Sequence, residues 1–257
     1  IVHIAMGRTS GFGSQGGVAR YDMRTQSWLS DWNMGQGGLP DDDVYAIACD
    51  ENYDVAYIGF NNGDGQIARY DYHANNFLPL LDDSDGVIGE PVFPGAMEHS
   101  GSHLYIGHME GGGITRIATT GTLVTGIVAF DVGTEANSIA LVPGTSPPAY
   151  AVGRAGGASG YNRVDHLSLN GLIPGVWDVL ATLSTGRIAE FAGNSTHVWV
   201  LPIDDYWSSY GTAVLEGLRM PNGTIEWTRA WNFNTEIASE IMLDGDVLWV
   251  TTNGWGM

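Results

Sequence analysis

Apolar and polar residues alternate along most of the chain in short runs, which Gly, Asn, Asp and Pro separate. The run VYAIACD at 44–50 is followed by VAYIGF at 55–60, QIARYD at 66–71 and NFLPLL at 76–81. Alternation with a period of two and enrichment in β-branched and aromatic residues are typical of strands. No long segment has the 3.6-residue period of an amphipathic helix. The pattern therefore predicts an all-β fold.

The same group of runs recurs along the chain. An Arg in the third run marks each unit, with spacings of 49, 47, 47 and 56 residues, at Arg20, Arg69, Arg116, Arg163 and Arg219. An apolar run that ends in Gly gives a second mark, with spacings of 52, 48 and 46 residues, at Gly7, Gly59, Gly107 and Gly153. Two independent marks define a repeat of about 48 residues.

Four strands in a repeat of this length are the signature of a β-propeller blade. With the strands of a blade labelled A to D, the chain runs B-C-D, four full blades, then A-B. We therefore expect a β-propeller of four-stranded antiparallel blades, with about five blades' worth present in a ring of about seven. We expect a single propeller domain or fragment over 1–257, with approximate units 1–37, 38–88, 89–132, 133–184, 185–235 and the partial 236–257.

The composition of the chain excludes some classes of binding partner. The formal net charge is −19, and all ten basic residues are Arg because the chain has no Lys. So acidic a protein repels nucleic acid and anionic membranes, which excludes both as partners, whereas it suits cations and basic ligands. The single cysteine, Cys49, cannot form an intrachain disulfide, and its apolar run predicts a small buried hydrophobe.

The stretch GLPDDDVYAIACDENYDVAYIGFNNGDGQIARYD (38–71) resembles the two-component-regulator propeller repeat. That repeat has GLP, a polar turn, a strand with Val, an acidic turn, an aromatic-Ile-Gly strand and a strand with Arg-Tyr-Asp. PNGTIEWTRAW (221–231) instead resembles the end of a quinoprotein-type repeat. The first resemblance implies an extracellular propeller, either the sensing part of a histidine kinase or part of a surface protein, with no catalytic residues set by the family. No signal peptide is visible in the given chain.

The antiparallel order sorts the connections into two ends, because B–C and D–A connections leave one end and A–B and C–D hairpins the other. The first end collects acidic loops, at Asp41, Asp42, Asp43, Asp64, Asp82, Asp83, Asp85, Glu90, Asp204 and Asp205. Aromatic rings, which stack on sugars and attract cations, accompany the last of these loops. The candidate ligand-binding residues are accordingly Asp204, Asp205, Tyr206, Trp207 and Tyr210. A plain set of solvated acidic turns is the alternative.

Other side chains offer weaker sites. DDSDG and NNGDG supply oxygen ligands for calcium at Asp82, Asp83, Asp85 and Asp64, although neither matches the twelve-residue calcium loop. Calcium is the possible cofactor, and no other is expected. Asn194 and Asn222 begin N-x-[ST] sequons, which are candidate glycosylation sites or ordinary turns.

The repeated Arg and the Asp two positions later lie on one face of a strand. A residue that recurs at the same position of successive repeats usually has a structural role. We therefore interpret this set as structural: Arg20, Asp22, Arg69, Asp71, Arg116, Arg163 and Asp165.

The sequence thus predicts a non-catalytic extracellular or cell-surface binding or scaffold module, whose acidic loops meet a protein, a peptide or a carbohydrate. Direct membrane insertion is not expected. The alternatives are a sensor domain of a two-component regulator and a propeller enzyme of quinoprotein, lyase or glycosidase type. An enzyme predicts inward Arg, His or Trp on the axial loops, where the sequence has acidic and glycine loops.

Overall fold

The fold consists of antiparallel β-sheets in two compact units, Ile1–Val132 and Gly133–Met257, in a computed structural model. The structure describes residues 1–6, 16–34, 38–50, 52–109, 112–130, 135–142, 149–156, 160–168, 177–182, 187–193, 196–203, 211–219, 224–233, 237–244 and 247–253. In these residues the sheets hold three, four, four, four, four and two strands in chain order. This is the succession of strands that the hydrophobic pattern predicts.

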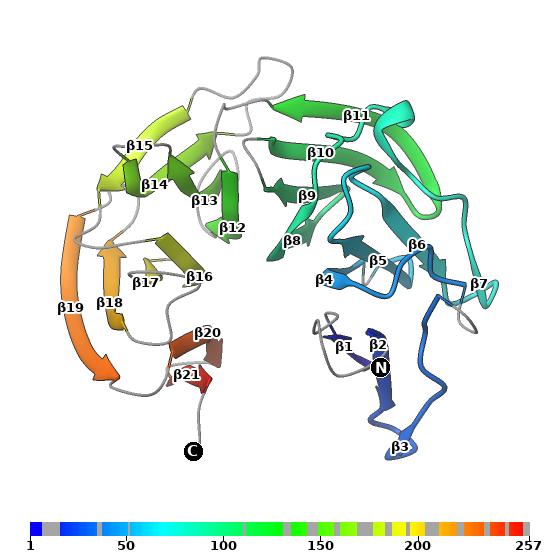
Figure 1. The fold of residues 1–257 in the computed structure, drawn as a ribbon, viewed down its shortest axis with the longest axis horizontal. Coiled ribbons are helices and arrows are strands. Elements are labelled where there is room, and N and C mark those ends of the chain that lie inside the picture. Colours follow the sequence, from blue (N-terminus) through cyan, green and yellow to red (C-terminus); the bar gives the residue numbers. More distant parts are fainter. Residues whose placement is uncertain are drawn as a thin grey trace. The chain divides into compact units, whose positions relative to one another are not determined.

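The first unit has three sheets, each a meander in which neighbouring strands are consecutive in the chain (Figure 1). The first sheet has strands Val2–Met6 (β1), Gly17–Asp22 (β2) and Ser27–Trp28 (β3). The second has Val44–Asp50 (β4), Val55–Phe60 (β5), Ile67–Asp71 (β6) and Asn76–Phe77 (β7). The third has Val92–Ser100 (β8), His103–His108 (β9), Gly113–Thr120 (β10) and Leu123–Phe130 (β11), after a one-turn 3-10 helix at Asp83–Asp85 (η1).

The second unit repeats the same meander. Its first sheet has strands Glu135–Val142 (β12), Ala149–Gly156 (β13), Gly160–Ser168 (β14) and Trp177–Thr182 (β15). The next has Arg187–Gly193 (β16), His197–Ile203 (β17), Gly211–Arg219 (β18) and Thr224–Phe233 (β19), and the last has Ile237–Asp244 (β20) and Val247–Asn253 (β21). The first strand of the middle sheet, β16, contacts the first strands of the other two sheets.

The repeat is also visible in the hairpin turns. Asp22 ends β2, and 49 residues later Asp71 ends β6. Each carboxylate accepts the backbone N–H groups two and three positions ahead, at distances of 2.8 to 3.3 Å. The last turn residues, Gln26 and Asn75, both have left-handed backbone, with φ of 52° and 54°. A side chain that caps its own turn fixes where each strand must reverse.

Two apolar layers hold the first unit together. One lies between the first and second sheets and includes Val18, Trp32, Ile58 and Tyr70. The other lies between the second and third sheets, and it contains Ala46, Ala48, Val55, Tyr57, Ile67, Leu81, Val87, Val92, Met97, Leu104, Ile106 and Ile117. Strand β5 of the second sheet, which lies between these two layers, is therefore buried on both faces.

The cross-strand register corrects one expectation. The sequence marks align Gly7 with Gly59 and Gly107, but the register pairs Ala5 with Val18 where Gly59 pairs with Ile67. Ala5 therefore occupies the position of Gly59. Register depends on which residues face each other across the ladder, and not on residue type, so a glycine two positions further along the sequence can imitate the mark.

Within the described residues, no helix is long and apolar enough to cross a membrane.

Candidate functional site

The connections of the first unit lie at two opposite ends of its sheets, since each sheet is an antiparallel meander. The β5–β6 and β7–β8 connections lie at one end, together with the residues that lead into β4. We call residues 38–43, 61–66 and 82–91 the acidic loop face, because they hold eight acidic residues and no Arg or Lys. The hairpins β4–β5, β6–β7, β8–β9 and β10–β11 lie at the other end.

The three aspartates before β4 mostly hold the loops in place. The Asp43 carboxylate accepts the Asn61 side-chain N–H at 2.9 Å, while the Asn61 backbone N–H donates to the Asp43 carbonyl at 3.0 Å. Asp41 accepts the Asp43 backbone N–H at 2.9 Å, and Asp42 accepts that of Met34. All three aspartates are half-buried. Their carboxylates are thus fixed in position next to solvent.

A capping box shapes the acidic turn that precedes the third sheet. The Asp82 carboxylate accepts the Ser84 backbone N–H at 2.9 Å and the Ser84 hydroxyl at 2.6 Å, and these bonds lower the pKa of Asp82. Asp85 accepts the Asp82 backbone N–H in return at 3.3 Å. Asp83 and Asp85 remain exposed, as does Asp64 in the neighbouring connection. These three carboxylates carry the outward negative charge of the face.

The metal candidates do not converge within the part of the chain that the structure describes. No three His, Cys, Asp or Glu side chains there are arranged to hold a metal ion. Asp82 and Asp85 use their oxygens on the capping box of η1 instead.

A buried histidine anchors the acidic loop face to the third sheet. His108 at the end of β9 is 0% exposed. Its Nδ1 lies 2.9 Å from the Glu90 carbonyl, and its Nε2 lies 2.9 Å from the Thr115 hydroxyl. The Ile88 backbone N–H donates to the same hydroxyl at 3.1 Å. One neutral tautomer satisfies this whole chain of bonds, and burial lowers the pKa of His108 to about 4.

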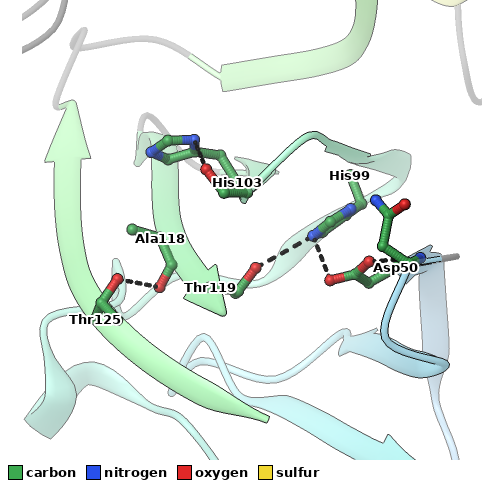
Figure 2. A network of polar contacts seen from close by, with 8 residues as sticks. Asp50, His99, His103, Ala118, Thr119 and Thr125 are labelled. Atoms are coloured by element: carbon green, nitrogen blue, oxygen red, sulfur yellow. Dashed lines mark hydrogen bonds and ion pairs between the residues drawn. The ribbon is translucent and has the colours of Figure 1, made fainter. Parts of the chain in front are cut away.

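A second buried network joins the first strands of two sheets at the hairpin end. Asp50 ends β4 and His99 lies near the end of β8, with side chains 0% and 4% exposed. Figure 2 shows the His99 ring between the Asp50 carboxylate and the Thr119 hydroxyl, with Nε2 3.3 Å from each. Tyr57 stacks on the ring at 5.7 Å and 9°. Burial lowers the pKa of His99, and the Asp50 carboxylate opposes that shift.

Glu98, the neighbour of His99 on β8, is a half-buried carboxyl group. Burial raises the pKa of Glu98 to about 7. Successive strand residues point to opposite faces, so Glu98 lies on the other face of β8 from His99. Sequence reasoning missed the half-buried Glu98 and the buried Asp50 and His108, because none of the three belongs to a sequence motif that marks it.

The repeated Arg side chains make different contacts in each sheet. Arg20 donates to the Ser30 carbonyl at 2.9 Å and lies over the Trp32 ring at 4.2 Å. Arg69 donates to the Pro79 carbonyl at 2.9 Å and to the Thr122 carbonyl of the next sheet at 3.0 Å.

Arg116 lies over the Phe130 ring at 5.5 Å. Within the described residues, these contacts join strands of one sheet or two neighbouring sheets, and the structural role of the whole set stays a prediction. Arg163 and Asp165 lie on β14, whose side chains are outside the described part.

The expected burial of Cys49 is wrong. Its side chain is exposed, because the alternate residues Ala46, Ala48 and Asp50 take the buried positions of β4. The Cys49 Sγ lies 3.8 Å from the Nδ1 of His3, whose Nε2 contacts the Tyr72 hydroxyl. The alternation in VYAIACD is compatible with either set of alternate residues facing the core, so the pattern alone does not determine whether Cys49 is buried.

The remaining candidates lie outside the described residues: Asp204, Asp205, Tyr206, Trp207, Tyr210, Asn194 and Asn222. They stay predictions from the sequence.

Solved structures identify the class of fold. The chain matches the Dos1 propeller with a TM-score of 0.66 at 9% identity, over 96% of this chain and 62% of that one. It matches a chain of a nidogen/laminin complex with a TM-score of 0.57 at 13% identity, over 92% and 82%. It also matches the extracellular domain of BT4673 from B. thetaiotaomicron, described as a one-component system, with a TM-score of 0.53 at 14% identity, over 95% and 38%.

The chain is therefore a β-propeller, which confirms the predicted fold of four-stranded antiparallel blades. It spans less than two thirds of the length of the Dos1 and BT4673 chains. No protein-family model matches the sequence, and no curated protein matches it. The resemblance to the two-component-regulator repeat accordingly rests on the residues quoted above.

Proposed function

We propose that this chain is a non-catalytic binding module of an extracellular propeller, whose acidic loop face engages a basic segment of a partner protein. The observation that carries the proposal is the charge of that face. Eight acidic residues stand on residues 38–43, 61–66 and 82–91 with no Arg or Lys among them. A surface of one sign attracts an oppositely charged partner and raises its rate of association.

The geometry supports recognition of an extended cation more than capture of a single ion. Asp64, Asp83 and Asp85 are exposed on two separate connections, and no three acidic groups of the described residues converge on one point. The half-buried Asp41, Asp43 and Asp82 brace the loops with hydrogen bonds. A braced surface loses less conformational entropy on binding, which favours affinity. Calcium remains a second ligand to test at the same face.

A peptide titration tests the proposal. Oligolysine should bind the wild-type chain in isothermal titration calorimetry, and the affinity should fall with added salt. Replacing Asp64, Asp83 and Asp85 together by Asn should weaken binding by about tenfold or more, or about 1.4 kcal/mol.

The matched control is Asp54→Asn in the β4–β5 hairpin, at the opposite end of the same sheet. Asp54 is exposed and has a φ of 53°, which Asn adopts readily. Equal weakening by both variants would reject the face-specific proposal, and so would tight binding of oligoglutamate. A calcium titration of the same two variants addresses the metal alternative.

A sensor domain of a signalling protein is the second candidate. It is favoured by the likeness to the extracellular domain of BT4673, which is described as a one-component system. In that case the acidic loop face would bind the signal. A propeller enzyme is the third candidate, and turnover of a sugar or alcohol substrate by the purified chain would favour it over both.

A further inference from the structure

The last strands of the four-stranded sheets differ in how their free edges are protected. Natural proteins protect such an edge by keeping the strand short or by placing charges or prolines on it. Strand β7 has only two residues. Strand β15 carries Asp178, and β19 carries Glu226 and Arg229. Strand β11, in contrast, has eight residues, LVTGIVAF, without a charge or a proline.

Part of the β11 edge is regular enough to pair with another strand. Strand β11 pairs with β10 on one side, and no strand of the described residues pairs with its other side. The register with β10 shifts once, at Thr125, so the stretch from Gly126 to Phe130 is regular. The backbone N–H and C=O groups that this stretch turns away from β10 can therefore bond to one added strand.

One side of this stretch lies near carboxylates of the acidic loop face. Ile127 packs on the apolar layer between the second and third sheets. A Cβ on Gly86 would lie 3.9 Å from the Cγ2 of Ile127, so the end of η1 is next to this side of β11. The exposed Asp83 and Asp85 belong to η1. Cationic side chains of an added strand are therefore favoured on the Ile127 side.

The other side of the stretch lies near a cation. Val128 points away from the Ile127 side, because successive strand residues point to opposite faces. Its register partner on β10 is Arg116, which therefore lies on the Val128 side. The Arg116 guanidinium lies over the Phe130 ring of β11 at 5.5 Å. Apolar side chains of an added strand are therefore favoured on the Val128 side.

We infer that the β11 edge binds an extended segment of a partner protein as an added strand, in which basic and apolar residues alternate. The inference rests on the proposed function, because it gives the proposed basic segment a conformation and a second contact. Backbone bonds to β11 supply affinity, and the alternation matches the two sides of the edge. A second copy of the chain is disfavoured, because each copy has a net charge of −19 and would bring its own Asp83 and Asp85 to the edge.

A peptide of alternating Lys and Val tests the inference on the purified chain. Its control is the same peptide with every backbone N–H methylated, which keeps the charge but has no backbone donor. In isothermal titration calorimetry the methylated peptide should bind about tenfold or more weakly. The unmethylated peptide should slow hydrogen–deuterium exchange in residues 126–130 and leave the short edge strand β7 unchanged.

Variants test the charged side of the edge. Replacing Asp83 and Asp85 together by Asn should weaken binding of the unmethylated peptide by about tenfold, since both carboxylates lie on the Ile127 side. The matched control is again Asp54→Asn, at the opposite end of the second sheet, and it should change the affinity little. Equal effects of the two variants would overturn the assignment of the basic residues to that side.

Slower exchange at 126–130, together with the loss of affinity on methylation, supports the inference. Equal affinity of the two peptides, or binding that leaves 126–130 unprotected, overturns it, and salt-dependent binding of oligolysine then leaves the proposed function standing. Failure of oligolysine and of both peptides to bind overturns the two proposals together. A dimer of the chain alone in sedimentation velocity, with 126–130 protected in the dimer, overturns the inference in favour of a second copy.

Discussion

At the scale of single residues, the first unit holds one buried and one half-buried ionisable group, His108 and Glu98, whose pKa values are shifted in opposite directions. Burial lowers the pKa of His108 to about 4 and raises that of Glu98 to about 7. Each folded environment favours the neutral form. The charged form of each group therefore destabilises the folded state: protonated His108 at low pH and ionised Glu98 at high pH. Variants at each position separate the two contributions to the free energy of unfolding.

We expect His108 to make stability depend on pH below neutrality. Between pH 4 and 6.5 the unfolded chain binds a proton at His108 that the folded chain does not, so its contribution is complete above pH 6.5 and is lost as the pH falls. The difference in unfolding free energy between wild type and His108→Gln should shrink by about 3 kcal/mol from pH 7 to pH 4. Urea denaturation measures it, with His73→Gln, at a position 76% exposed, as control. A difference independent of pH would contradict the buried neutral imidazole.

Glu98 should act in the opposite direction. Because the pKa of Glu98 is raised on folding, the folded chain keeps this proton to a higher pH than the unfolded chain does. The contribution of Glu98 to stability is therefore present below pH 4.5 and is lost as the pH rises toward 7. Glu98→Gln should therefore raise the unfolding free energy at pH 8 and change it little at pH 4. Thermal melts at the two pH values check the sign. Lower stability at pH 8 would show that the Glu98 carboxylate has a favourable partner.

Arg69 should matter for stability because it ties two sheets. Arg69→Met leaves the Pro79 and Thr122 carbonyls without their donor, which should cost about 1–3 kcal/mol. Arg24→Met, at a side chain 90% exposed, should change stability by less than about 0.5 kcal/mol. Urea denaturation of the two variants makes the comparison. Equal effects would mean that the Arg69 bonds contribute nothing beyond a surface charge.

At the scale of strands and loops, tight backbone approaches fix how neighbouring connections of the acidic loop face meet. Gly65 and Gly101 both have left-handed backbone, with φ of 59° and 62°. A Cβ on Gly65 would lie 1.9 Å from the Ile88 carbonyl oxygen, whereas a Cβ on Gly101 would meet nothing within 4 Å. Gly65 therefore lets the β5–β6 and β7–β8 connections touch.

These two glycines make a matched test. Gly101→Ala should cost about 1–2 kcal/mol for the left-handed backbone alone. Gly65→Ala should cost roughly 4 kcal/mol or more, since the backbone must also move. Equilibrium unfolding gives both values. Similar costs would show that the loops separate easily, and the acidic face would then not be a fixed surface.

The sequence predicted the positions of the strands better than the burial of the individual residues within them. Strand alternation and the 49-residue offset of ARYD were enough to predict β4 to β7, because turns such as Asp71 to Asn75 carry their own local signal. Which of Cys49 and Asp50 is buried could not be predicted, since the alternation in VYAIACD fits either face of β4 against the core. The acidic residues of the loops were found, but their division into bracing and exposed carboxylates required the hydrogen bonds.

At the scale of the whole molecule, an acidic chain is organised into a repeat whose described sheets hold partly or fully buried arginines and whose connections carry the exposed carboxylates Asp64, Asp83 and Asp85. The net charge is −19, and Arg20, Arg69 and Arg116 are engaged with carbonyls or rings. The guanidinium groups of these side chains therefore contact carbonyls and rings of their own sheets or of a neighbouring sheet, and on the proposed function the negative charge of the loops attracts the partner.

Hydrogen–deuterium exchange with and without saturating oligolysine tests the central claim most directly, because it reports which end of the sheets meets the peptide. The account predicts slower exchange in residues 38–43, 61–66 and 82–91, with little change in the hairpin turns at 52–54, 72–75 and 101–102. Protection confined to those hairpin turns, or no protection despite binding, would contradict an acidic loop face as the interaction surface.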